Sequence, residues 1–175
     1  MLIKTISTLL LALCISANAF AGDFGAGNGG DGVVENGKVY LFDLYESGVT
    51  NPNLSRDSVE NSRDLAILDK VFSSMNNEVK NIIARKISAI RYIDPVLAES
   101  LLLAFQQYSW KIVQLPLNNV KDDDGTDIDY PIQNLVQVAV RNNRTIRISN
   151  SYMSKMDAGN LAALIFHEVI YALIP

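Results

Sequence analysis

Cysteine, histidine and tryptophan each occur once in the 175 residues. Cys14 lies in the apolar N-terminal stretch, and Leu13 precedes it where a lipoprotein signal has a small residue, so lipidation is not expected. Beyond residue 14 no thiol is present for a disulfide, a thiolate metal site or a cysteine nucleophile. One histidine allows at most one histidine-based triad, and no G-x-S-x-G motif accompanies it.

The N-terminal 21 residues have the pattern of a secretory signal peptide. Lys4 precedes an apolar run from Ile6 to Ile15. The small-x-small pattern of a signal-peptidase cleavage site then occurs twice, ending at Ala19 and at Ala21. This predicts export to the periplasm or the cell exterior, and the run is too short for a stable membrane span. Without Lys4, 14 basic residues face 19 acidic ones, a net charge of −5 that predicts no nucleic-acid partner.

Residues 22–32, GDFGAGNGGDG, contain the G-x-G-x-x-G pattern of dinucleotide-binding proteins. That pattern works only between a strand and the helix whose N-terminus receives the pyrophosphate. Here a signal peptide precedes the glycines, and a hairpin pattern with Asn36-Gly37 follows them. We therefore expect a flexible glycine-rich leader over 22–32 and no nucleotide site.

The remaining residues, 33–175, are predicted to form one α+β domain with antiparallel hairpins. The hairpin VVENGKVYLFDLYE is followed by a helix with capping-box spacing at Asp57 and Glu60, which either breaks at SSMNNE or continues to Ile90. Asp94-Pro95 predicts a helix start, and a strand is expected from Ser109. Residues 135–149 predict a second hairpin turning at 142–143, and 158–173 a final helix capped by Asp157.

The acidic stretch KDDDGTDIDYP suggests a calcium loop, but its spacing fails. With Gly125 at the sixth position, Val120 and Pro131 occupy the first and twelfth positions, where an EF-hand needs acidic ligands. A solvated turn is favoured over a weak calcium site. Trp110 is expected to pack in the core rather than to bind a sugar.

The last helix, AGNLAALIFHEVIYALIP, is apolar nearly all round, which is typical of a buried helix. His167 and Tyr171 are four residues apart and share a face, while Glu168 lies about 100° around the helix. Buried polar side chains need partners, so these three residues are the candidate site.

A hairpin followed by a buried helix with HEVIY resembles the core of the zincin metallopeptidases, whose motif is H-E-x-x-H. The resemblance implies Glu168 as the catalytic general base and His167 and Tyr171 as ligands of a zinc ion. Tyr171 replaces the second histidine, and a phenol is a poor zinc ligand at neutral pH. In zincins the third zinc ligand follows the motif helix further along the chain, whereas this sequence ends at Pro175. A carboxylate of the acidic loop could replace that ligand, but the sequence does not identify which one.

The leader GNGGDG, the hairpin ending in LFDLYE and the H-E-x-x-Y helix together resemble a group of uncharacterised secreted bacterial proteins. Members of that group continue beyond the helix and commonly carry a basic residue where this chain has Ala172, which implies that this copy is truncated. This resemblance implies no established activity.

Two functions remain open. The favoured one is a non-catalytic exported protein in which His167, Glu168 and Tyr171 form a buried structural cluster, with Glu168 paired to Arg141, Arg144 or Arg147. The alternative is an incomplete zincin-like, zinc-dependent hydrolase. Neither reading identifies a substrate or a partner.

Overall fold

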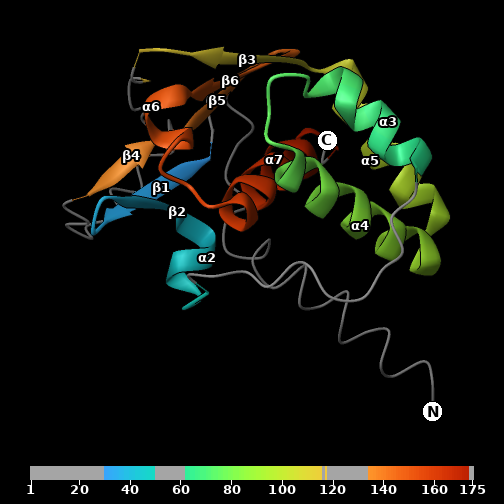
Figure 1. Ribbon diagram of the computed structural model, residues 1–175, viewed down its shortest axis with the longest axis horizontal. Helices are drawn as coiled ribbons and strands as arrows, with labels where there is room; N and C mark the ends of the chain where they lie inside the picture. The colour runs from blue at the N-terminus through green and yellow to red at the C-terminus, as the bar shows by residue number, and fades with distance from the viewer. Residues whose placement is uncertain (1–29, 50–61, 116, 118–133, 174–175) are drawn as a thin grey trace.

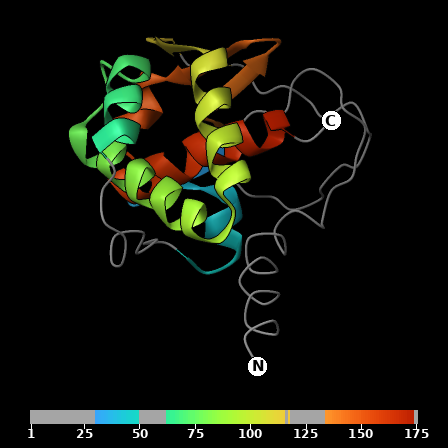
Figure 2. The same ribbon diagram turned by 90° about the vertical axis from the view of Figure 1, so that its right-hand side faces the viewer.

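The computed structural model describes residues 30–49, 62–115, 117 and 134–173. Two small three-stranded sheets lie on one side of the molecule and a group of helices lies on the other, with helix α7 between them (Figure 1). Seen from the right-hand side, helices α3, α4 and α5, between residues 62 and 107, lie nearest the viewer, with the strands behind and above them (Figure 2). The expected α+β class is confirmed.

The first sheet has the order β2-β1-β4, formed by β1 (Asp31–Glu35), β2 (Lys38–Leu41) and β4 (Leu135–Gln137). β1 pairs with both neighbours in antiparallel register. The turn residues Asn36 and Gly37 have φ angles of 51° and 77°, as a two-residue hairpin turn requires. The predicted first hairpin is therefore confirmed.

Two boundaries near this hairpin differ from expectation. β1 includes Asp31 and Gly32, which were expected in the flexible leader, so the folded domain extends back at least to Gly30. The chain also leaves the sheet at Leu41, and the expected strand residues FDLYE form the helix α2 (Phe42–Glu46). Val39 to Phe42 is an unbroken apolar run, so no change in alternation marks where the strand ends and the helix begins.

The second sheet has the order β3-β6-β5, formed by β3 (Ser109–Val113), β5 (Ala139–Asn142) and β6 (Thr145–Ser149). The hairpin of β5 and β6 is confirmed, with its turn at 143–144, one residue later than predicted, and a positive φ of 50° at Asn143. β3 pairs with β6 in parallel register, which was not predicted. Val138 separates β4 from β5, and there the chain passes from one sheet to the other.

Three helices form most of the helical side: α3 (Ser62–Val71), α4 (Asn77–Ile93) and α5 (Pro95–Gln107). The helical pattern does break before α4, whose N-cap Asn76 accepts a hydrogen bond from the Glu78 amide. Asp94 caps α5 as predicted, by accepting two amide hydrogen bonds of 3.0 Å. The expected capping box at Asp57 and Glu60 and the acidic loop both lie outside the described residues.

A short helix, α6 (Asn150–Met153), joins β6 to the final helix α7 (Ala158–Leu173). Asp157 caps α7 as predicted, since its carboxylate accepts the Asn160 amide at 2.7 Å. α7 packs against α4, α5 and β2. The predicted burial is confirmed for Leu161, Leu164, Ile165 and Val169, whereas Ile170 is half-buried and Leu173 is exposed. None of the helices described for this chain is long and apolar enough to cross a membrane.

The core between helices and sheets contains a group of aromatic rings. Phe105 lies edge-on to Phe72 and to Phe166, and Trp110 lies 4.9 Å from Phe72 between ring centroids. The Trp110 indole N–H donates to the Phe105 carbonyl. Trp110 therefore belongs to the core, as expected.

Candidate functional site

The candidate site lies along α7, where an apolar helix carries polar side chains into the interior. Glu168 is 1% exposed and His167 is 18% exposed by its side chain. The two residues are adjacent in sequence and project about 100° apart, so each meets a different element.

Glu168 faces the start of the folded chain. Its carboxylate oxygen Oε1 accepts a hydrogen bond of 2.6 Å from the Gly30 amide, 138 residues away in sequence. The Gly30 carbonyl accepts the amides of Val138 and Ala139, each at 3.0 Å, where the chain crosses between the sheets. Both backbone groups of Gly30 are therefore hydrogen-bonded: its amide to Glu168, and its carbonyl to Val138 and Ala139.

Gly30 leaves little room for a side chain beside α7. A Cβ atom on Gly30 would lie 2.1 Å from Leu164 Cδ1 and 3.1 Å from Glu168 Oε1. The first distance is far below van der Waals contact, so the fully buried Leu164 side chain would have to shift to make room for a Cβ atom. Close packing of backbone against helix, and not phosphate binding, explains this glycine.

His167 faces α2. Its Nδ1 lies 2.8 Å from Asp43 Oδ2, so the imidazole donates to the carboxylate. The hydrogen bond from His167 lowers the pKa of the Asp43 carboxyl. Burial alone would lower the pKa of His167, but the hydrogen bond to Asp43, together with the charges of Glu168, Asp43 and Asp31, outweighs it, and the net pKa is raised.

Tyr171 lies against His167, as the four-residue spacing predicts. The two ring centroids are 4.5 Å apart and the ring planes are inclined by 39°. Burial raises the pKa of the Tyr171 phenol, and the negative charges of Asp43 and Glu168 raise it further. The phenol is therefore protonated at neutral pH, and it is an even weaker metal ligand than a free tyrosine.

Burial also raises the pKa of Glu168, and the nearby His167, the Gly30 amide and Arg141 oppose this rise. Of the three arginines that were expected as partners, Arg141 acts on the carboxylate, through its charge. Arg141 is paired across the strands with the buried Ile146, on the core side of the sheet. Arg147 is out of phase with Ile146 and exposed, and Arg144 lies in the exposed turn.

A third polar residue of α7 completes the contacts with the N-terminal hairpin. Asn160 is fully buried, and its side-chain oxygen accepts the Leu41 amide at 3.1 Å, where β2 ends. Asn160, His167 and Glu168 therefore hold the end of β2, helix α2 and Gly30, respectively. We call these three residues the hairpin clamp.

The sequence identified two members of the clamp but not their partners. Gly30 and Asp43 belong to the GNGGDG and LFDLYE stretches, and neither stretch shows by itself that it meets the H-E-x-x-Y helix. Asn160 could have been noticed as a polar residue in an otherwise apolar helix, where burial demands a partner.

The residues described here provide few ligands for a metal ion. Among them no three His, Cys, Asp or Glu side chains come close enough together to hold one. His167 provides one imidazole, Tyr171 a protonated phenol, and Glu168 a buried carboxylate already bonded to Gly30. Catalytic zinc needs three protein ligands and an open position, and this set does not fit it.

Comparison of the chain with models of known protein families, with curated proteins and with solved structures gives no match.

Proposed function

We propose that this chain is an exported, non-catalytic protein whose H-E-x-x-Y helix acts structurally, by fastening the N-terminal hairpin to the rest of the domain. The observation that carries the proposal is the 2.6 Å hydrogen bond between the buried Glu168 carboxylate and the Gly30 amide. A general base must reach the proton that it removes, directly or through one water molecule. Glu168 is 1% exposed and bonded to backbone, so it suits an anchor better than a base.

Export rests on the residues that precede the domain. Residues 1–21 combine Lys4, an apolar run and small residues at Ala19 and Ala21. The proposed destination is the periplasm or the cell exterior. A clamp of hydrogen bonds, of which those of Glu168 and Asn160 are buried, suits a chain that has no disulfide available after residue 14 to secure its N-terminal end.

One observation favours the alternative, an incomplete zincin-like hydrolase. The Nδ1 atom of His167 is bonded to Asp43, which directs the other ring nitrogen, Nε2, away from the carboxylate. Carboxylate–histidine pairs of this kind commonly orient metal-binding imidazoles. Under this alternative Glu168 would have to leave Gly30 before it could act on a water molecule.

Two variants of Glu168 separate an anchor from a base. In Glu168→Gln the amide carbonyl can still accept the Gly30 amide, so stability should change by less than about 1 kcal/mol. In Glu168→Ala the Gly30 amide loses its acceptor and a cavity forms, which should cost about 2 to 4 kcal/mol. The measurement is urea unfolding of the chain from Gly22, and equal losses in both variants would refute the anchoring role.

Metal content tests the alternative directly. Elemental mass spectrometry on the chain from Gly22 and on His167→Ala should find no stoichiometric zinc in either protein. Near-stoichiometric zinc that disappears in the variant would instead support the hydrolase, and Glu168→Gln should then abolish any peptidase activity while leaving the fold intact.

A further inference from the structure

The sheet β3-β6-β5 has one face toward the helices and one face away from them. On the helix side lie Trp110 and Ile146, which are partners in the register. On the other side, Lys111 of β3 is the partner of Arg147 of β6, and Arg147 is in turn the partner of Val140 of β5. We call this second side the outer face.

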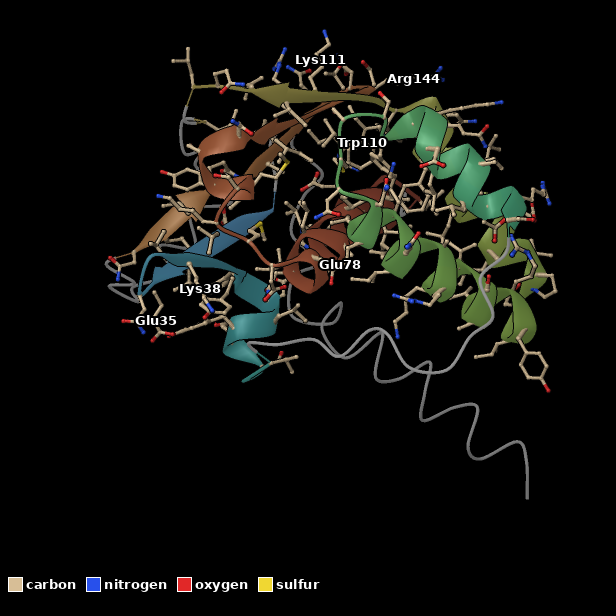
Figure 3. All side chains as sticks on the ribbon, in the orientation of Figure 1. Glu35, Lys38, Glu78, Trp110, Lys111 and Arg144 are labelled. Carbon is tan, nitrogen blue, oxygen red and sulfur yellow. The ribbon has the colours of Figure 1, made fainter. Side chains whose placement is uncertain are left out.

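The outer face carries positive charge in a chain that is acidic overall. Lys111, Arg147 and the turn residue Arg144 are all exposed, and none of the three forms an ion pair among the described residues. Figure 3 shows Lys111 and Arg144 at the same end of the molecule, with Trp110 on the helix side. Neither 109–115 nor 134–156 contains an aspartate or glutamate.

An exposed apolar side chain lies just past the end of β3 that is opposite Arg144. Leu115 lies two residues beyond the end of β3 and is 77% exposed. The preceding residue, Gln114, accepts a 3.0 Å hydrogen bond from Asn150, which holds this end of the strand against the start of α6. Val113 and Val140 add half-buried apolar surface on the same face.

We propose that the outer face is a docking surface for an anionic phospholipid membrane. Basic side chains on a strand pair, together with an exposed leucine past the end of one strand, let a protein adsorb to such a membrane by charge attraction and shallow apolar insertion. The inference deepens the proposed function, because an exported protein meets lipid surfaces. It uses no residue of the hairpin clamp.

The test is co-sedimentation of the chain from Gly22 with vesicles of phosphatidylcholine, alone or mixed with phosphatidylglycerol. Binding should require phosphatidylglycerol and should weaken as salt is added, because exposed charges are screened. Each basic residue near an anionic surface contributes about fivefold to partitioning, so Lys111→Gln/Arg147→Gln should reduce it about 25-fold. Leu115→Ser should reduce the part of the binding that survives added salt.

The matched control is Lys38→Gln/Lys155→Gln, which removes the same charge beside the other sheet, where the Val39 amide donates to the Lys155 carbonyl. It should retain binding within about twofold, and circular dichroism should show that both double variants are folded. Absence of binding at low salt, or an equal loss in the control, would overturn the proposal. Binding of soluble polyglutamate as tight as that of vesicles would replace the membrane with an acidic peptide. None of these results depends on Glu168→Gln or on zinc content, so the two proposals can fail separately.

Discussion

Replacement of Gly30 by alanine tests whether the N-terminal strand and α7 are held together as described. The added Cβ would lie 2.1 Å from Leu164 Cδ1 and 3.1 Å from Glu168 Oε1. Inserting a methyl group into packed surroundings costs about 1 to 3 kcal/mol. Any separation also stretches the Gly30–Glu168 hydrogen bond, and bonds to charged groups contribute about 1.5 to 3 kcal/mol. We expect Gly30→Ala to lower the free energy of unfolding by about 2 to 4 kcal/mol.

The assay is urea unfolding followed by circular dichroism, analysed as a double-mutant cycle with Leu164→Ala. Leu164 is fully buried, so its truncation alone should cost about 2 to 5 kcal/mol. The same truncation removes the atom that the new Cβ would meet, so Gly30→Ala should cost less in the Leu164→Ala background. Equal costs in both backgrounds, or a stable Gly30→Ala protein, would refute the close contact.

Three further measurements test the rest of the fold. The pKa of His167 is raised in the folded protein above the value of about 6.5 that it has in the unfolded chain. Protonation of His167 therefore stabilises the fold at pH values below about 6.5, and this stabilisation is lost as the pH rises through the folded pKa. The melting temperature should therefore fall above about pH 6.5, and less so in His167→Gln. Asp64→Asn should destabilise by about 3 kcal/mol in urea titrations, because Arg91 donates to this fully buried carboxylate. Asn160→Ala should cost about 1 to 3 kcal/mol, with faster hydrogen exchange at the Leu41 amide that loses its acceptor.

The parts of the fold that the sequence predicted depend on local signals. Asn36-Gly37 determines a hairpin turn because both residues tolerate positive φ. Asp94 and Asp157 begin helices because their carboxylates accept amides two or three residues ahead. Each signal and its structural consequence lie within a few residues of one another.

The parts that were not predicted depend on contacts between distant residues. The parallel pairing of β3 with β6 joins residues 36 apart, and no local pattern specifies it. α2 has no side-chain cap to mark its start. Its position depends instead on contacts with β1 and β2, such as the hydrogen bond of Tyr45 to Glu35, and on the bond of Asp43 to His167 of α7. The partners of the candidate site were missed for the same reason, although its helix, its burial and the proximity of His167 to Tyr171 were predicted correctly.

The hairpin clamp gives one physical reason for features that look unrelated in the sequence. A glycine at position 30 allows the backbone to approach α7, Glu168 accepts its amide, and His167 reaches Asp43 on the next segment. A catalytic histidine–glutamate pair would instead direct both side chains at one reacting group. Here the two adjacent residues bind different segments of the chain. This divergence supports the proposed anchoring role of the H-E-x-x-Y helix.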